Sequence, residues 1–242
     1  MTHSTDTSRR AVIGAALTMA AAGAAQAQSS PSGVKPLAKA FTIQSAPKPL
    51  RFDPAKIDGI SEKLIRSHWE NNYSGALKAL GVVKTRLNEA NGNKDIPAFI
   101  YNDLKREHLI RTGSVVLHEL YFDNLGGNGQ AGAGLRTAIA SSFGTFDAWE
   151  TEFRTIGAGL GGGSGWVVLG LNTHTGQLEN YWLADHGHSP AATLPLLVMD
   201  MYEHAYQMDY GAAAAKYVDA FFRNIQWDEV ASRLERANRL MA

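Results

Sequence analysis

The sequence contains no cysteine among its 242 residues. This absence excludes disulfides, zinc–thiolate sites and thiol catalysis, so any bound metal must be held by His, Asp or Glu. It also suits an oxidising compartment, where a free thiol is a liability. An excess of charge is lacking too, because 23 basic side chains balance 23 acidic ones. We therefore expect neither nucleic acid nor another strongly charged macromolecule as a partner.

Long apolar runs are lacking except near the N-terminus. There the chain reads Ser8-Arg9-Arg10, then an alanine-rich apolar stretch over residues 11–25, then Ala25-Gln26-Ala27. A basic start, a short apolar stretch and small residues at a cleavage site predict a secretory signal over residues 1–28. Paired arginines after a serine match a twin-arginine signal. The alternative, a membrane anchor, is disfavoured because the run is short and weakly hydrophobic. We expect an exported protein of the bacterial cell envelope or periplasm, without stable membrane insertion.

The remaining chain divides at glycine-rich segments. Residues 29–50 are rich in Ser, Pro, Gly and Lys, which predicts an N-terminal arm or linker. Residues 51–128 carry helical periodicity at about 60–91, with an interruption at Gly81, and again at 99–125. They are expected to form a helical hairpin domain. The run Gly126-Gly127-Asn128-Gly129 marks the boundary to a C-terminal domain, residues 129–242.

The C-terminal part mixes helical and strand patterns. Helical patterns occupy residues 135–143, 146–156 and 201–241. Strand composition, bounded by turn residues, occurs at 166–171, 178–183 and 194–199. The expected class is α+β, a helical hairpin followed by an α/β domain.

Three of the eight histidines and one aspartate fall where a metal site needs them. His68 and His118 lie in the first and second expected helices, and Asp200 and His204 stand four residues apart after the last expected strand. A single histidine on a helix is more often a hydrogen-bonded core residue. Taken together, these side chains predict a ligand set without cysteine.

Several motifs resemble the iron/manganese superoxide dismutase family, in that family's order, over roughly residues 45–236. The run Asp-Met-Tyr-Glu-His-Ala-Tyr at 200–206 is similar to the family's Asp-x-Trp-Glu-His-Ala-Tyr signature. Three further runs also resemble family motifs: Ser141-Ser142-Phe143-Gly144-Thr145-Phe146, Gly163-Ser164-Gly165-Trp166 and Leu194-Pro195-Leu196-Leu197.

The resemblance implies a fold in which the α/β domain has a small three-stranded antiparallel sheet. It implies the conversion of superoxide to oxygen and hydrogen peroxide by one-electron cycling of iron or manganese, one ion per subunit. Zinc does not change its oxidation state, whereas three imidazoles and a carboxylate suit iron or manganese. The metal ligands implied by the family are His68, His118, Asp200 and His204.

The family also implies residues around the metal and between subunits. Tyr121 and Trp166 would line the site. A homodimer would form through Glu203, His204 and Tyr206.

The sequence departs from the family after the first ligand. Residues four apart share a helix face, so His68, Asn72 and Ala76 are expected to form one stripe facing the metal. The family usually has a histidine in place of Asn72 and a gateway tyrosine in place of Ala76. Tyr73 would point about 100° away from this stripe on an ideal helix. The alternative function is therefore a dismutase-fold metalloprotein with weak or altered redox activity.

The residue that hydrogen-bonds solvent at the metal also differs. The family often places a glutamine either at the position of Ser114 or at that of His186, twenty residues after Trp166. We interpret His186 as the residue in this role, the alternative being an exposed loop histidine. Without either glutamine the choice between iron and manganese stays open, with a lean to iron.

Two further alternatives use the same ligands. A zinc hydrolase is disfavoured because no general-base glutamate has motif support. A binding protein with a vestigial site is disfavoured by the intact ligand set.

Overall fold

The computed structural model describes residues 37–42 and 46–241. The predicted signal over residues 1–28 and the first part of the predicted arm lie outside the described residues.

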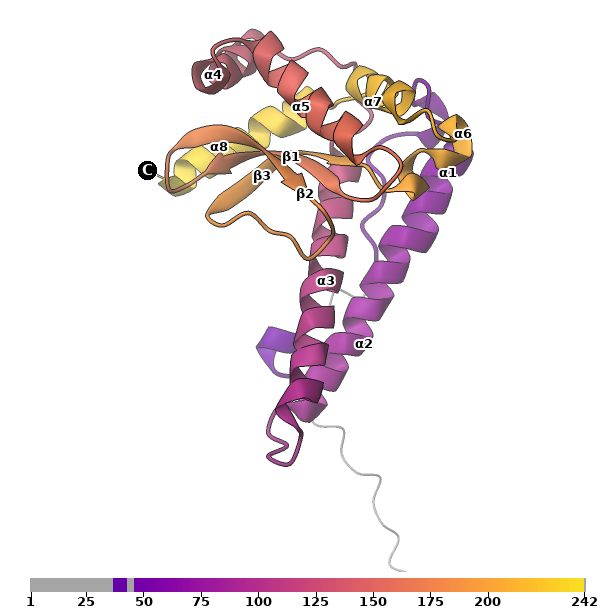
Figure 1. Ribbon diagram of the computed structural model, residues 1–242, viewed down its shortest axis with the longest axis vertical. Helices are drawn as coiled ribbons and strands as arrows, with labels where there is room; N and C mark the ends of the chain where they lie inside the picture. The colour runs from indigo at the N-terminus through magenta and orange to yellow at the C-terminus, as the bar shows by residue number, and fades with distance from the viewer. Residues whose placement is uncertain (1–36, 43–45, 242) are drawn as a thin grey trace, which may run out of the picture. The chain divides into compact units, whose positions relative to one another are not determined.

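A helical hairpin forms the first half of the described chain (Figure 1). After the short turn η2 (Pro54–Lys56), its first arm runs through α1 (Glu62–Ser67), η3 (His68–Tyr73) and α2 (Ser74–Ala90), and its second is α3 (Ala98–Asp123). The Ser61 hydroxyl caps the first arm by accepting a hydrogen bond from the Leu64 N–H at 3.1 Å. Although Gly81 interrupts the helical pattern of the sequence, the helix continues beyond it, because α2 passes through this glycine. One glycine costs a helix only about 1 kcal/mol, which packing against α3 offsets.

The segment η3 is a π-helical turn, and it changes which side chains face inward. The Ser74 N–H bonds to the Trp69 carbonyl five residues back, instead of four as in an α-helix. Tyr73 is consequently buried, with 1% of its surface exposed, while Asn72 is half-buried. The expectation that Tyr73 points away is wrong, because the four-residue spacing behind it does not hold across a π turn.

Part of the predicted arm packs on the hairpin. The short turn η1 (Lys39–Phe41) buries Phe41 against Val83 and Leu87. The Ala38 N–H donates to the buried Asn88 side chain at 3.0 Å.

The second half contains α4 (Ala133–Phe143), α5 (Phe146–Leu160) and a three-stranded sheet. Its strands are β1 (Trp166–Asn172), β2 (Gln177–Leu183) and β3 (Thr193–Asp200), in the order β2-β1-β3 with antiparallel pairing throughout. The expected fold class is confirmed. The register sets Trp166 opposite Asp200, so the first residue of β1 lies beside the last residue of β3.

The chain after β3 is helical, as predicted for residues 201–241, but it is divided into several helices. It forms η4 (Glu203–Ala205), α6 (Gln207–Tyr210), α7 (Ala214–Arg223) and α8 (Trp227–Met241). Gly211 ends α6 with a φ of 54°, a left-handed conformation that favours glycine. The Asn224 side chain ends α7 by bonding the Asp58 backbone.

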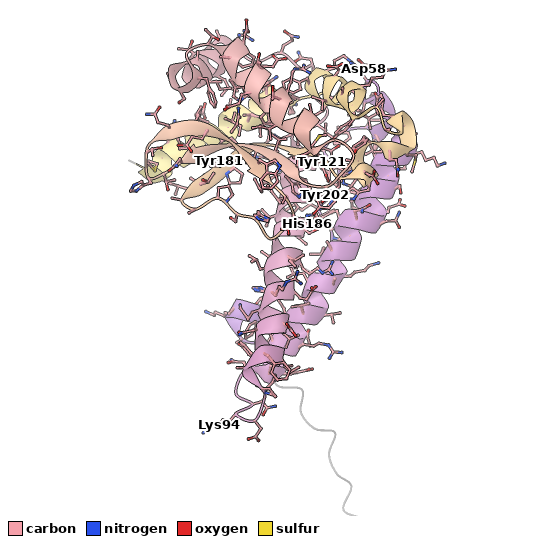
Figure 2. The ribbon with its side chains drawn as sticks, in the orientation of Figure 1. Asp58, Lys94, Tyr121, Tyr181, His186 and Tyr202 are labelled. Carbon is pink, nitrogen blue, oxygen red and sulfur yellow. The ribbon has the colours of Figure 1, made fainter. Side chains whose placement is uncertain are left out.

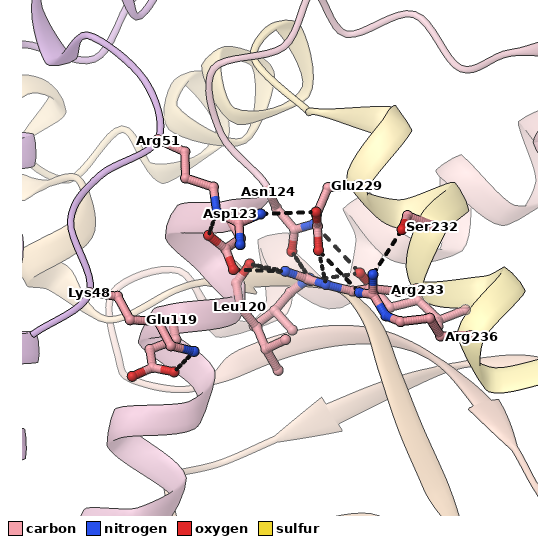
Figure 3. A network of polar contacts seen from close by, with 12 residues as sticks. Lys48, Arg51, Glu119, Leu120, Asp123, Asn124, Glu229, Ser232, Arg233 and Arg236 are labelled. Carbon is pink, nitrogen blue, oxygen red and sulfur yellow. Dashed lines mark hydrogen bonds and ion pairs between the residues drawn. The ribbon is translucent and has the colours of Figure 1, made fainter. Parts of the chain in front are cut away.

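Helices cover the sheet and hold it to the hairpin. α5 packs on β1, while α8 and the C-terminal part of α3 pack on β3. The buried Arg233 of α8 donates to the Leu196 carbonyl at 2.9 Å. It also donates to the Asn124 side chain at 3.1 Å, within the polar network that Figure 3 shows. Among the described residues, every helix is too short or too polar to span a bilayer.

Candidate metal centre

Four side chains bring one potential ligand atom each into a cluster whose atoms lie within 4.8 Å of one another. They are the predicted ligands, and each comes from a different element: His68 from η3, His118 from α3, Asp200 from β3 and His204 from η4. The first three are almost fully buried, and the His204 side chain is 23% exposed.

The Asp200 Oδ2 atom is the point on which the imidazoles converge. It lies 3.1 Å from His68 Nε2, 3.1 Å from His204 Nε2 and 3.7 Å from His118 Nε2. Two donors each about 2.1 Å from a shared cation, and separated by 90–120° around it, lie about 3.0–3.6 Å apart. The distances from Asp200 to the three imidazoles are close to this range, as expected for side chains that share one ion.

Buried ring nitrogens without partners support the same interpretation. Both ring nitrogens of His68 and the Nε2 atom of His118 are buried without a hydrogen-bond partner among the described residues. Although His68 Nε2 lies near Asp200, the angle does not suit a hydrogen bond. Leaving such atoms unsatisfied costs about 1–3 kcal/mol each. A cation that accepts one lone pair from each ring would remove this cost at the two ligand nitrogens, so the residues fit a metal ion.

Protonation also prepares the imidazoles as ligands. His118 Nδ1 lies 2.7 Å from the Ser114 carbonyl, which only accepts, so Nδ1 carries the proton and Nε2 has a free lone pair. Burial lowers the pKa of His118 to about 3, and burial also lowers the pKa of His68. Both rings are therefore neutral at neutral pH.

Asp200 supplies the negative charge. Burial would raise its pKa, but the charge of His204 and the contacts with His204 and His68 hold that pKa well below its usual range. Its second oxygen, Oδ1, accepts from the Tyr202 N–H at 2.8 Å, which fixes the carboxylate plane.

His186 lies at the edge of the cluster, in the loop after β2. Its Nδ1 accepts a hydrogen bond from the buried Trp166 indole at 3.1 Å. Burial lowers the pKa of His186, so the ring is neutral. An indole N–H only donates, so the proton of the neutral ring sits on Nε2, leaving that atom as a donor.

Stacked rings join His186 to a ligand. The Tyr202 ring stacks on His186 with centroids 4.6 Å apart and on His204 with centroids 5.2 Å apart. Figure 2 shows Tyr202, His186 and Tyr121 gathered where the sheet meets the hairpin. Tyr202, which stands where the family signature has tryptophan, thus connects two site histidines.

Tyr121 and Tyr217 brace the buried side of the cluster. The Tyr121 ring lies 5.2 Å from the His68 ring. The Tyr217 hydroxyl donates to the Asp200 carbonyl at 2.8 Å and lies 3.3 Å from the Tyr121 hydroxyl. Sequence reasoning missed Tyr217, which carried no signal beyond its place in an apolar helical pattern.

Gly113 was missed as well. A Cβ atom built on it would lie 1.8 Å from the His186 carbonyl oxygen. Only glycine lets α3 approach the His186 loop this closely.

Among the remaining expected site residues, Asn72 is half-buried on η3 and Ala76 is buried on α2. Neither side chain can supply the ring and hydroxyl of a gateway tyrosine.

A buried centre of three histidines and one aspartate, between a helical hairpin and a small antiparallel sheet, defines a metalloprotein without cysteine. Residues 131–233 match the model of the C-terminal domain of iron/manganese superoxide dismutases. A superoxide dismutase [Fe] of Cupriavidus metallidurans is 51% identical over 192 residues, covering 79% of this chain and 97% of the relative. The chain belongs to the iron/manganese superoxide dismutase family, as its motifs predicted.

More distant relatives include both metal types. A superoxide dismutase [Fe] of Aquifex aeolicus is 35% identical over 76% of this chain and 88% of its own length. A superoxide dismutase [Mn] of Haloferax volcanii is 31% identical over 79% of this chain and 94% of its own length.

Proposed function

We propose that this protein is a superoxide dismutase that holds one iron ion per subunit at His68, His118, Asp200 and His204. The observation that carries the proposal is the convergence of three imidazoles on one buried carboxylate. The family and its relatives support dismutation as the reaction, and they support iron or manganese as the ion. An ion held by these four side chains would supply the one-electron redox chemistry that dismutation requires.

The residues of the chain supply charge balance, protons and exclusion of water. Asp200 compensates positive charge inside the core, where an unpaired ion would be costly. Trp166 holds His186 in the tautomer that donates from Nε2. We assign to His186 the hydrogen bond that the family takes from a glutamine, because formation of hydrogen peroxide from superoxide consumes protons.

The lean to iron rests on similarity. The relative with 51% identity is an iron enzyme, whereas the superoxide dismutase [Mn] of Haloferax volcanii is 31% identical. Reconstitution of the metal-free mature chain with iron, manganese or zinc tests both metal and reaction. Iron should give the fastest superoxide removal, and zinc, which does not change oxidation state, should give none. Activity with zinc would contradict the redox mechanism, and faster removal with manganese would reverse the metal assignment.

We also propose a homodimer through the segment after Asp200. Glu203 is exposed and His204 is partly exposed, so both are available to a second subunit. Tyr206 is buried within its own subunit, where its hydroxyl accepts from the Gly162 N–H at 3.0 Å. We therefore assign the contact to Glu203 and His204, with Tyr206 supporting them from behind. Sedimentation should give twice the monomer mass, and Glu203→Ala should weaken the association.

Export to the periplasm is proposed from the sequence alone. Replacing Arg9 and Arg10 by lysine should retain the precursor in the cytoplasm, because the paired arginines are the recognition signal. Fractionation followed by N-terminal sequencing checks this, and unchanged export of the variant would contradict it.

Asn72 and Ala76 are the specific reason to consider the alternative function, weak or altered redox activity. Full occupancy by iron or manganese together with slow superoxide removal would favour it.

A further inference from the structure

Lys48 lies in the segment that precedes α1, and its backbone is hydrogen-bonded to the π turn. Its N–H donates to the Tyr73 hydroxyl at 2.8 Å, and its carbonyl accepts from the Trp69 indole at 2.9 Å. Both partners belong to η3, the turn that begins with the ligand His68. One residue of the segment thus holds both ends of that turn.

The Lys48 side chain reaches the other ligand-bearing helix. Its ammonium pairs with Glu119, the residue that follows His118 in α3, as Figure 3 shows. The Tyr73 hydroxyl donates to the same carboxylate at 2.8 Å. The contacts close a triangle in which the tyrosine hydroxyl both accepts and donates, an arrangement in which hydrogen bonds strengthen one another.

The triangle adjoins the centre through packed rings. The Tyr73 ring lies 6.5 Å from the His118 ring. The Phe122 ring packs against both Tyr73 and His68, with its centroid 6.2 Å from the Tyr73 ring and 5.0 Å from the His68 ring. A shift of Tyr73 would therefore be passed to both imidazoles, because close-packed interiors transmit displacement.

We propose that Lys48, Tyr73 and Glu119 form a positioning clamp that sets the separation of His68 and His118, and with it the affinity of the centre for its metal ion. None of the three is a ligand, and none is a catalytic residue. The proposal rests on the proposed function only in requiring iron or manganese at the four ligands. The π turn contributes to the clamp, because it carries both the ligand His68 and Tyr73, whose hydroxyl donates to Glu119.

A second ion pair provides a matched control. Arg51, three residues after Lys48, pairs with Asp123, four residues after Glu119, at 3.3 Å. The two cations are similarly exposed, 55% for Lys48 and 65% for Arg51. Arg51 contacts Asp123 and Glu229 but not η3. The Lys48–Glu119 and Arg51–Asp123 pairs both join the segment before α1 to α3. Of the two, the Lys48–Glu119 pair is the one that also contacts Tyr73 of the turn that begins with His68.

The test measures the Mn²⁺ dissociation constant of the mature protein by competition with a chelator, with unfolding of the metal-free form followed in parallel. Glu119→Gln and Tyr73→Phe should each weaken binding about 10- to 100-fold, the usual effect of removing a partner around a metal site. Lys48→Met should weaken it as well, while Lys48→Arg restores most of the affinity. Arg51→Met should stay within about twofold of wild type while lowering stability as much as Lys48→Met, since exposed ion pairs contribute about 0–1 kcal/mol.

Wild-type affinity in both Glu119→Gln and Tyr73→Phe would overturn the clamp. An equal loss in Arg51→Met would also overturn it, because the effect would then be one of general stability. If Tyr73→Phe does not fold, the exposed Lys48 still decides the matter through its Met and Arg variants. Absence of Mn²⁺ and Fe²⁺ binding by the wild type would instead contradict the proposed function.

Discussion

The hydrogen bond from Trp166 to His186 determines what that histidine can do. It leaves Nε2 as the donor of the neutral ring. His186→Ala should lower turnover about 10- to 100-fold with metal content unchanged, because His186 lies outside the ligand cluster. His188→Ala is the matched control, since this exposed histidine of the same loop lies outside the ligand cluster and pairs with Asp185. Superoxide removal per bound ion checks the prediction, and unchanged kinetics in His186→Ala would remove its role.

Asp200 is the one charged ligand, and its replacement tests the electrostatics of the core. Asp200→Asn keeps the shape and removes the charge that balances the cation. We expect the metal content of the purified protein to fall by more than tenfold, measured by elemental analysis. A variant that retained full metal would show that the three imidazoles suffice.

At the scale of elements, α3 passes very close to the His186 loop at Gly113. Gly113→Ala would bring a methyl group within 1.8 Å of the His186 carbonyl, so the loop must move. We expect a stability loss of about 1–3 kcal/mol and a turnover close to that of His186→Ala. Gly134→Ala is the control, because a Cβ there meets nothing within 4 Å. Thermal unfolding and kinetics measure both effects, and normal turnover in Gly113→Ala would contradict the packing argument.

The same contacts show what the sequence could and could not predict. The strands were predictable because β1, β2 and β3 carry strand composition between turn residues. The ligands were predictable because the motif at 200–206 belongs to the family. The π turn was not, since the contacts of Tyr73 are with Lys48 and Glu119, 25 and 46 residues away in sequence. The helix breaks at Gly211 and Asn224 were not predicted, because apolar periodicity continues on both sides of them.

Across the whole molecule, Arg233 holds the last helix to the sheet and to the hairpin. Its guanidinium is 6% exposed and bonds the Leu196 carbonyl, the Asn124 side chain and Glu229. Arg233→Met removes the buried cation that joins Leu196, Asn124 and Glu229, so unfolding in urea should show a loss of about 3 kcal/mol. Arg236→Met, half-exposed on the same helix, should change stability by less than about 0.5 kcal/mol. Equal losses in both would contradict the network.

The metal is expected to contribute to the stability of the folded chain. Without the metal, the ring nitrogens of His68 and His118 that have no hydrogen-bond partner stay buried beside Asp200. A ligand at 1,000 times its Kd stabilises the folded state by about 4 kcal/mol, so chelation should lower the thermal midpoint by several degrees. Calorimetry before and after chelation measures this, with Asp200→Asn as a variant that should not respond.

The central claim is that this centre removes superoxide. The most direct measurement is the rate of superoxide removal by the purified mature chain, with bound metal determined on the same samples over a range of occupancies. The account predicts rapid removal in proportion to bound iron or manganese, with Asn72 and Ala76 in place. Full occupancy with little removal would contradict it, and would show that these replacements have redirected an intact set of ligands.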